Sequence, residues 1–298
     1  MSQFNRYRGR FAPSPTGPLH FGSLVAALGS CLEARSRGGE WLLRMEDVDE
    51  PRCSAAAAIG LLRTLERLGF EWDGEVMVQS RRTGRYRELL EWLKDKGLAY
   101  PCGCTRRELA DSALAPDGAA IYPGTCRNGL PPGKAARAWR LRVGDASAAF
   151  ADALQGTVSQ DLGRDVGDFV LLRADGYFAY QLAVVADDAD QGITDVVRGA
   201  DLLDSTPRQI HLQRCLGFPT PAYAHLPVAV NASGEKLSKQ TLAAAVDDLP
   251  AAHVLVSALR FLGQEPPDGM EDAASIWRWA VPNWRLGKVP RARTLPAP

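Results

Sequence analysis

The stretch RFAPSPTGPLHFGS, residues 10–23, holds the local pattern on which the interpretation of the whole chain depends. A short apolar segment ends at Ala12, three prolines and a glycine follow, and apolar residues then recur at helical spacing from Phe21 onward. This order predicts a strand, a rigid turn and a helix that begins beside His20 and Gly22. A helix N-terminus offers unpaired N–H groups and partial positive charge, so the turn is a candidate phosphate-binding site. An exposed helix cap would explain the same residues without any ligand.

Strand-like and helical patterns alternate along the rest of the chain. Strand-like runs occur in EWLLRM, AWRLRV, DFVLLRADG and FAYQLAVVADDAD, and helical periodicity occurs in residues 54–69, in residues 83–97 and in TPRQIHLQRCLG. In the last of these segments Thr206 is a candidate N-cap, and Pro207 fits the first helical turn. The alternation predicts an α/β fold with a doubly wound parallel sheet. Residues 242–285 are expected to be mostly helical.

The composition of the 298 residues is that of an ordinary globular protein. Lys and Arg together number 35, as do Asp and Glu, so the overall charge does not indicate a nucleic-acid binder, although a local basic patch is compatible with it. No apolar window of about 18 residues occurs, so we expect neither a membrane span nor a signal peptide. The six unevenly spaced cysteines do not fit a secreted disulfide scaffold. We therefore expect a cytoplasmic protein.

Residues 99–138 break the alternation and contain Cys102, Cys104 and Cys126 among many glycines and prolines. A structural zinc ion takes four ligands, usually thiolates or imidazoles, but this segment contains no histidine. The fourth ligand could be a carboxylate, a water, a distant group or the phenol of Tyr122. One zinc ion would explain how a segment with few apolar residues stays folded, which three free cysteines in a loop would not.

A second polar stretch, GEKLSKQ, residues 234–240, places two lysines around a serine in a glycine-led loop. Such a loop can close over a triphosphate, although a lysine-rich surface turn fits the same pattern. Taken with PSPTGPLHFGS and RMEDVDEPR, it resembles the paired signature motifs of class I aminoacyl-tRNA synthetases, in the form of the glutamyl and glutaminyl branch. The chain departs from the usual motifs at Ser23 and Gln240, where that family has a histidine and a serine.

This resemblance implies a Rossmann-type catalytic domain that condenses glutamate with ATP and Mg²⁺. The expected catalytic residues are His20, Lys236 and Lys239. The expected ATP-binding residues are Pro13, His20, Gly22, Ser23, Lys236, Ser238 and Lys239. The expected glutamate-binding residues are Arg10, Phe11, Ala12, Pro13, Ser14, Glu46, Tyr180 and Arg198. Outside the resemblance, Arg10 and Glu46 would be interpreted as a surface ion pair and Tyr180 as strand filler. The sequence does not show which arginine binds which carboxylate.

The same resemblance implies four segments. Residues 1–98 are the expected first half of the catalytic domain, 99–150 an insertion with a zinc-binding subdomain, 151–240 the second half ending in the lysine loop, and 241–298 a helical, stem-like subdomain with a basic tail. The cations of this tail, which either contact RNA phosphates or are solvated, are Arg285, Lys288, Arg291 and Arg293.

A zinc site made of Cys102, Cys104, Tyr122 and Cys126 resembles that of the glutamyl-queuosine tRNA(Asp) synthetases, short relatives of glutamyl-tRNA synthetase. Only 58 residues follow Gln240, too few for a whole anticodon-binding region. The resemblance implies a monomer that activates glutamate without tRNA and transfers it to queuosine in the anticodon of tRNA(Asp). The alternatives are a truncated glutamyl-tRNA synthetase that charges the 3′ end of tRNA, and a non-catalytic RNA-binding relative.

Overall fold

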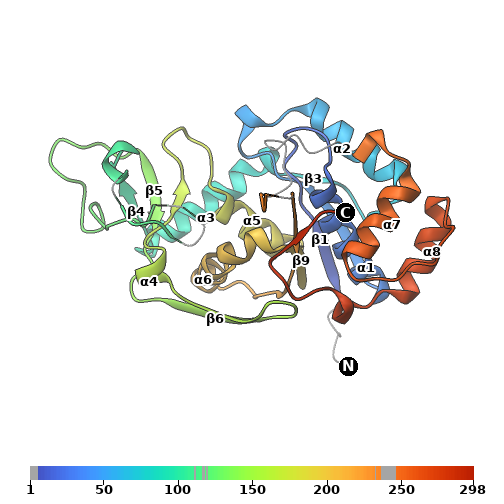
Figure 1. Cartoon of the computed structure of the whole chain (residues 1–298). Coiled ribbons are helices and arrows are strands. Elements are labelled where there is room, and N and C mark those ends of the chain that lie inside the picture. The colour runs from blue at the N-terminus through green and yellow to red at the C-terminus, as the bar shows by residue number, and fades with distance from the viewer. Residues whose placement is uncertain (1–5, 111, 116–117, 119, 232, 236–245) are drawn as a thin grey trace, which may run out of the picture.

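The computed structural model describes residues 6–110, 112–115, 118, 120–231, 233–235 and 246–298 (Figure 1). The helices in this part of the chain are α1 (Phe21–Ser36), α2 (Ala55–Arg67), α3 (Thr83–Asp95), α4 (Leu162–Asp165), α5 (Tyr180–Asp190), α6 (Thr206–Leu216), α7 (Ala251–Phe261) and α8 (Ala273–Asn283). The strands are β1 (Arg8–Phe11), β2 (Glu40–Met45), β3 (Met77–Val78), β4 (Ala99–Cys102), β5 (Ala138–Leu141), β6 (Ser147–Asp152), β7 (Gly156–Asp161), β8 (Val170–Leu172), β9 (Asp195–Gly199), β10 (Ala222–Leu226), β11 (Val228–Val230) and β12 (Thr294–Pro296).

The central strands lie in the order β3-β2-β1-β9-β10. Strands β1, β2 and β3 pair in parallel, as do β9 and β10. Strands β1 and β9 lie side by side, where the N–H of Thr194 donates to the carbonyl of Arg8 at 3.0 Å. The carboxyl ends of β1 and β9 line one cleft, so the two strands run in the same direction. This order confirms the predicted doubly wound sheet, whose topological switch point lies between β1 and β9.

Helix α1 leaves the proline turn after β1 and packs along the sheet. Its residues from Leu24 to Ala34 are almost all buried, and it contacts α7 and α8, which lie on its outer side in Figure 1. The close approach to β10 requires a glycine, since a Cβ at Gly29 would meet Cδ1 of Leu226 at 2.6 Å. The helix N-terminus is thereby held at the carboxyl ends of the parallel strands.

The predicted strand over FAYQLAVVADDAD is wrong, because Tyr180–Asp190 form helix α5. Every residue from Gln181 to Asp188 is buried, so the helix has no polar face. Its sequence therefore lacks the 3.6-residue alternation by which helices are recognised, and a short apolar run does not distinguish a helix from a strand. The helices predicted at residues 54–69 and 83–97 are confirmed as α2 and α3.

The insertion forms a separate end of the molecule, opposite α7 and α8 in Figure 1. Strands β4, β5 and β8 make an antiparallel sheet there, from which the cysteine-bearing loops extend. The C-terminal segment is attached to the rest of the chain, because β12 pairs in parallel with β11 and Arg293 forms an ion pair with Asp204 at 3.3 Å, while the basic side chains of the segment are exposed. Within the described ranges, every helix is too short or too polar to cross a bilayer.

Candidate active site

A cleft of about 920 Å³ opens at the switch point of the sheet. All the expected glutamate and ATP residues that the structure describes line this one cleft: Arg10, Phe11, Ala12, Pro13, Ser14, His20, Gly22, Ser23, Glu46, Tyr180 and Arg198. The remaining expected residues, Lys236, Ser238 and Lys239, lie outside the described residues. A crevice at the carboxyl ends of parallel strands, beside a helix N-terminus, is the usual ligand position in such sheets.

His20 is the N-cap of α1 and faces the cleft with Gly22 and Ser23. The N–H of Ser23 donates to His20 Nδ1 at 3.3 Å, so Nε2 carries the proton of the neutral ring. That nitrogen lies 3.0 Å from the hydroxyl of Ser23. The histidine therefore caps the helix and also lines the cleft, and its contact with phosphate stays a prediction. Ser23, at the position where the family motif has a second histidine, orients the ring.

Glu46 follows β2 and ends in the buried wall of the cleft. Its Oε1 has no hydrogen-bond partner among the described residues and lies 3.6 Å from Nε of Arg44. Burial raises the pKa of Glu46 to about 7, although the neighbouring Arg44 and Arg10 act in the opposite direction. A buried carboxylate oxygen without a donor is suited to receive a substrate ammonium group.

The positive charge of Arg10 is paired with a carboxylate inside the protein. Asp188 of α5 accepts from Nε and Nη2 of Arg10 at 3.1 and 3.3 Å, and it also accepts from Nη2 of Arg44 at 2.6 Å. Burial alone would raise the pKa of Asp188, but the two guanidinium groups hold it at about 2. Arg10, Arg44, Asp188 and Glu46 thus form a buried group of two guanidinium and two carboxyl groups.

Arg198 of β9 has a different environment, because its hydrogen-bond partners among the described residues are all neutral. Its Nη2 donates to Thr206 Oγ1 and Gln209 Oε1, both at 2.8 Å, and its Nη1 donates to the hydroxyl of Tyr180 at 3.5 Å. The prediction of Thr206 as an N-cap is wrong, since Ser205 occupies that position and Thr206 opens α6. Its hydroxyl binds Arg198 instead. The charge of Arg198 is left available to a ligand carboxylate.

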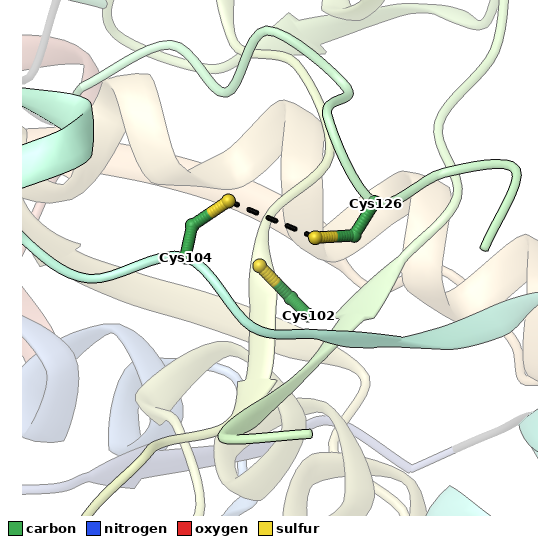
Figure 2. Close-up of side chains that lie close together, drawn as sticks. All are labelled: Cys102, Cys104 and Cys126. Carbon is green, nitrogen blue, oxygen red and sulfur yellow. Dashed lines mark hydrogen bonds between the residues drawn. The ribbon is translucent and has the colours of Figure 1, made fainter. Parts of the chain in front are cut away.

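Three cysteines gather in the insertion, outside the cleft (Figure 2). The sulfurs of Cys102, Cys104 and Cys126 lie within 4.8 Å of one another, and those of Cys104 and Cys126 are 3.7 Å apart. Tetrahedral zinc with Zn–S bonds of about 2.3 Å requires sulfurs about 3.8 Å apart. The cluster is therefore compatible with a metal site.

The phenol of Tyr122, one of the fourth ligands that the sequence left open, lies beside this cluster. Its oxygen lies 3.4 Å from Sγ of Cys102 and 3.5 Å from Sγ of Cys104, and it accepts from the N–H of Cys126 at 2.8 Å. Burial raises the pKa of Tyr122, so the phenol keeps its proton unless a metal ion replaces it. Nε of Arg140 donates to Sγ of Cys102 at 3.3 Å, which favours the thiolate.

Comparison with known proteins decides the family. The sequence profile of the class I tRNA synthetases (E and Q), catalytic domain, matches residues 6–268. The Glutamyl-Q tRNA(Asp) synthetase of Aromatoleum aromaticum is 62% identical over 98% of this chain and 93% of its own length. The protein of that name from Dechloromonas aromatica is 64% identical over 96% of both chains. The chain belongs to the glutamyl-Q tRNA(Asp) synthetase family.

Members of this family are class I synthetase-like ligases, and class I synthetases use ATP and Mg²⁺. Comparison with solved structures agrees with this family assignment. A glutamate-tRNA synthetase from Elizabethkingia anophelis superposes with a TM-score of 0.79 at 26% identity, over 96% of this chain and 67% of that one. The glutamate tRNA ligase from Elizabethkingia meningosepticum, at 24% identity and a TM-score of 0.80, shares the fold.

Sequence reasoning missed the partners that hold the family's pocket residues in place. Asp188 is 178 residues from Arg10, and Gln209 comes from a different helix than Tyr180. A single sequence gives no local signal for such pairs. The one available signal was the pair of adjacent acids at Asp187 and Asp188 inside an apolar run, because buried carboxylates need cationic partners.

Proposed function

We propose that the chain activates L-glutamate with ATP and Mg²⁺, without tRNA, and transfers the glutamyl group to queuosine in the anticodon of tRNA(Asp). The observation that carries this proposal is the 62% identity, over nearly the whole of both chains, with a Glutamyl-Q tRNA(Asp) synthetase. The charge distribution in the cleft supports glutamate as the amino acid. We further propose that the protein acts as a monomer in the cytoplasm.

The cleft suggests how the two ends of glutamate are separated. Glu46 provides, for the α-ammonium group, a carboxylate oxygen that accepts no hydrogen bond from the described residues. Arg198 provides a cation with neutral partners, and Tyr180 a hydroxyl beside it, for the side-chain carboxylate. We assign the side-chain carboxylate to Arg198 rather than to Arg10 because the charge of Arg10 is already balanced by Asp188. Residues Phe11, Ala12, Pro13 and Ser14 line the same cleft.

Activation then requires positioning and charge stabilisation rather than a covalent enzyme intermediate. An oxygen of the glutamate α-carboxylate attacks the α-phosphorus of ATP, the bond to the bridging oxygen breaks, and pyrophosphate leaves with its charge. His20, Gly22 and Ser23 face the phosphates from the start of α1. We propose that Lys236, Ser238 and Lys239 contact the triphosphate, and that the lysines neutralise the departing pyrophosphate.

The second step forms an ester on the RNA. A hydroxyl of the queuosine ring attacks the glutamyl carbonyl carbon, the bond to the phosphate oxygen breaks, and AMP leaves.

We also propose that one structural zinc ion is held by Cys102, Cys104, Tyr122 and Cys126. When bound, zinc cross-links the loops between β4 and β5. The support is the spacing of the sulfurs and the convergence of the phenol oxygen on them.

The first test is ATP–pyrophosphate exchange on the purified protein with glutamate and no tRNA, followed by transfer of labelled glutamate to tRNA(Asp). We expect exchange without tRNA, and label on tRNA(Asp) that carries queuosine but not on tRNA(Asp) with guanosine at that position. Exchange that needs tRNA(Glu), with label at the 3′ end, would support the truncated synthetase instead. Absence of exchange under both conditions would support the non-catalytic relative.

The pH dependence of exchange provides a second test. Below a pKa of about 7, Glu46 is protonated and no longer attracts an ammonium group. We therefore expect kcat/KM for glutamate to fall about tenfold for each pH unit below 7 and to be level above it, because kcat/KM reports ionisations of the free enzyme. Initial rates at low glutamate from pH 5.5 to 8.5 measure this. If kcat/KM of a Glu46→Gln variant fell below the same pH, the ionisation would belong to another group.

A further inference from the structure

Arg198 is joined to a buried pair that the glutamate site does not include. His225 lies directly opposite Arg198 in the register of β10 and β9, and Nε of Arg198 donates to Nε2 of His225 at 3.1 Å. On the other side of the ring, Nδ1 lies 2.6 Å from Oδ2 of Asp152, the last residue of β6. The side chains of His225 and Asp152 are both fully buried.

The chemistry of these contacts determines the tautomer of His225. A guanidinium group only donates hydrogen bonds, so Nε2 must be the unprotonated, accepting nitrogen. The proton is then on Nδ1, which donates to the carboxylate of Asp152. Burial lowers the pKa of His225 to about 4, although the hydrogen bond to Asp152 acts in the opposite direction, so the ring is neutral near pH 7.

A neutral ring between the carboxylate and the guanidinium has a specific consequence. Had Asp152 bound Arg198 directly, the arginine would be a neutralised ion pair like Arg10 with Asp188. With His225 in between, the Nε edge of Arg198 is fixed while the carboxylate of Asp152 stays one imidazole away. Arg198 lines the cleft, and its Nη1 edge beside Tyr180 forms no ion pair with a carboxylate in the part of the chain that the structure describes.

We infer that His225, oriented by Asp152, is a positioning residue that fixes Arg198 for a substrate carboxylate without neutralising it. This inference rests on the proposed role of Arg198 in glutamate binding. Asp152 also accepts hydrogen bonds from the N–H groups of Leu154, Gln155 and His225, so it shapes the β6–β7 turn as well. Substitution of Asp152 therefore mixes positioning with folding, and His225 is the residue to test.

Two variants distinguish the roles of the two ring nitrogens of His225. In His225→Gln, the side-chain amide reaches the position of Nε2 and its oxygen can accept from Arg198. In His225→Asn, the amide reaches only the position of Nδ1, where its nitrogen can donate to Asp152, and the acceptor for Nε of Arg198 is lost. We expect His225→Asn to raise KM for glutamate roughly 10- to 100-fold, the size of one lost charge-assisted hydrogen bond, with KM for ATP unchanged. We expect KM for glutamate of His225→Gln to stay within about threefold of the wild-type value.

The readouts are glutamate and ATP KM values in pyrophosphate exchange, with melting temperatures of both variants. The inference would be overturned if the two variants had equal KM values for glutamate. This holds whether both values match the wild type or both are raised while both variants lose melting temperature. A wild-type protein without glutamate-dependent exchange would instead overturn the proposed function.

A measurement on the unmodified chain keeps the inference testable if His225→Asn does not fold. The chain has four histidines, so two-bond ¹H–¹⁵N correlation spectra of ¹⁵N-histidine-labelled protein at pH 7 can be assigned. We expect the Nδ1–H tautomer for His225. The Nε2–H tautomer or a charged ring would contradict the inference, because neither can accept from Arg198.

Discussion

Arg198→Leu is expected to lower kcat/KM for glutamate in pyrophosphate exchange on the order of 10³-fold, because it leaves a bound carboxylate unpaired in a buried site. The loss is large because the wild-type guanidinium has neutral partners, so that its charge is directed to the substrate. Arg198→Lys keeps the charge but cannot reach His225, Thr206 and Gln209 at once. It is expected to recover only part of the activity.

The control for Arg198→Leu is an arginine of similar connectivity outside the cleft. Arg35 at the end of α1 donates to Asp73 at 2.7 Å and to the carbonyl of Glu71 at 2.8 Å. We expect Arg35→Leu to leave kcat/KM near the wild-type value. Melting temperatures of both variants separate lost stability from lost binding. Equal losses of activity in the two variants would argue against a direct role for Arg198.

The second large effect is expected at the cysteine cluster. Cys126→Ala is expected to reduce bound zinc from about one ion per chain to almost none, because zinc sites derive on the order of 10 kcal/mol from the complete ligand set. Elemental analysis of protein purified without added metal measures this. Limited proteolysis is expected to cut the variant within residues 103–137, since the loops there depend on the ion rather than on a large apolar core.

The matched control is Cys215→Ala on α6, a half-buried free cysteine outside the cluster. It is expected to retain both zinc and protease resistance. Tyr122→Phe tests the fourth ligand alone, and we expect it to bind zinc more weakly than the wild type but not to lose it. Full zinc content in Cys126→Ala would refute the proposed ligand set.

The fold could be predicted from the sequence wherever an element has one buried and one exposed face. Helix α2 is such a case, with Leu61 and Leu65 buried and Arg63 exposed, and its periodicity is plain. Helix α5 was missed because it is buried on all sides, so that its sequence carries no periodic signal. The division of the chain into four segments stays a prediction.

The candidate site could be predicted only where short motifs carry it. The turn from Arg10 to Ser23 is contiguous in sequence, and the motif-bearing Glu46, Tyr180 and Arg198 were added by resemblance. The residues that hold these side chains were not found, because Asp188, Thr206, Gln209 and His225 belong to the site only through strand order and packing. One sequence does not record which distant residues meet.

The position of β1 between β2 and β9 also has a consequence for synthesis on the ribosome. Strand β2 follows β1 closely, but Thr194, which starts the contact with β9, comes 186 residues after Arg8. At 5–20 residues per second, on the order of 10–40 s pass between the emergence of the two partners. During that interval the side of β1 that later meets β9 has no partner, so Arg8–Phe11 form an unpaired sheet edge that carries two arginines. The strand arrangement that creates the cleft thus leaves one edge of the nascent sheet unpaired until β9 has been made, and the charges of Arg8 and Arg10 disfavour edge-to-edge association in that interval.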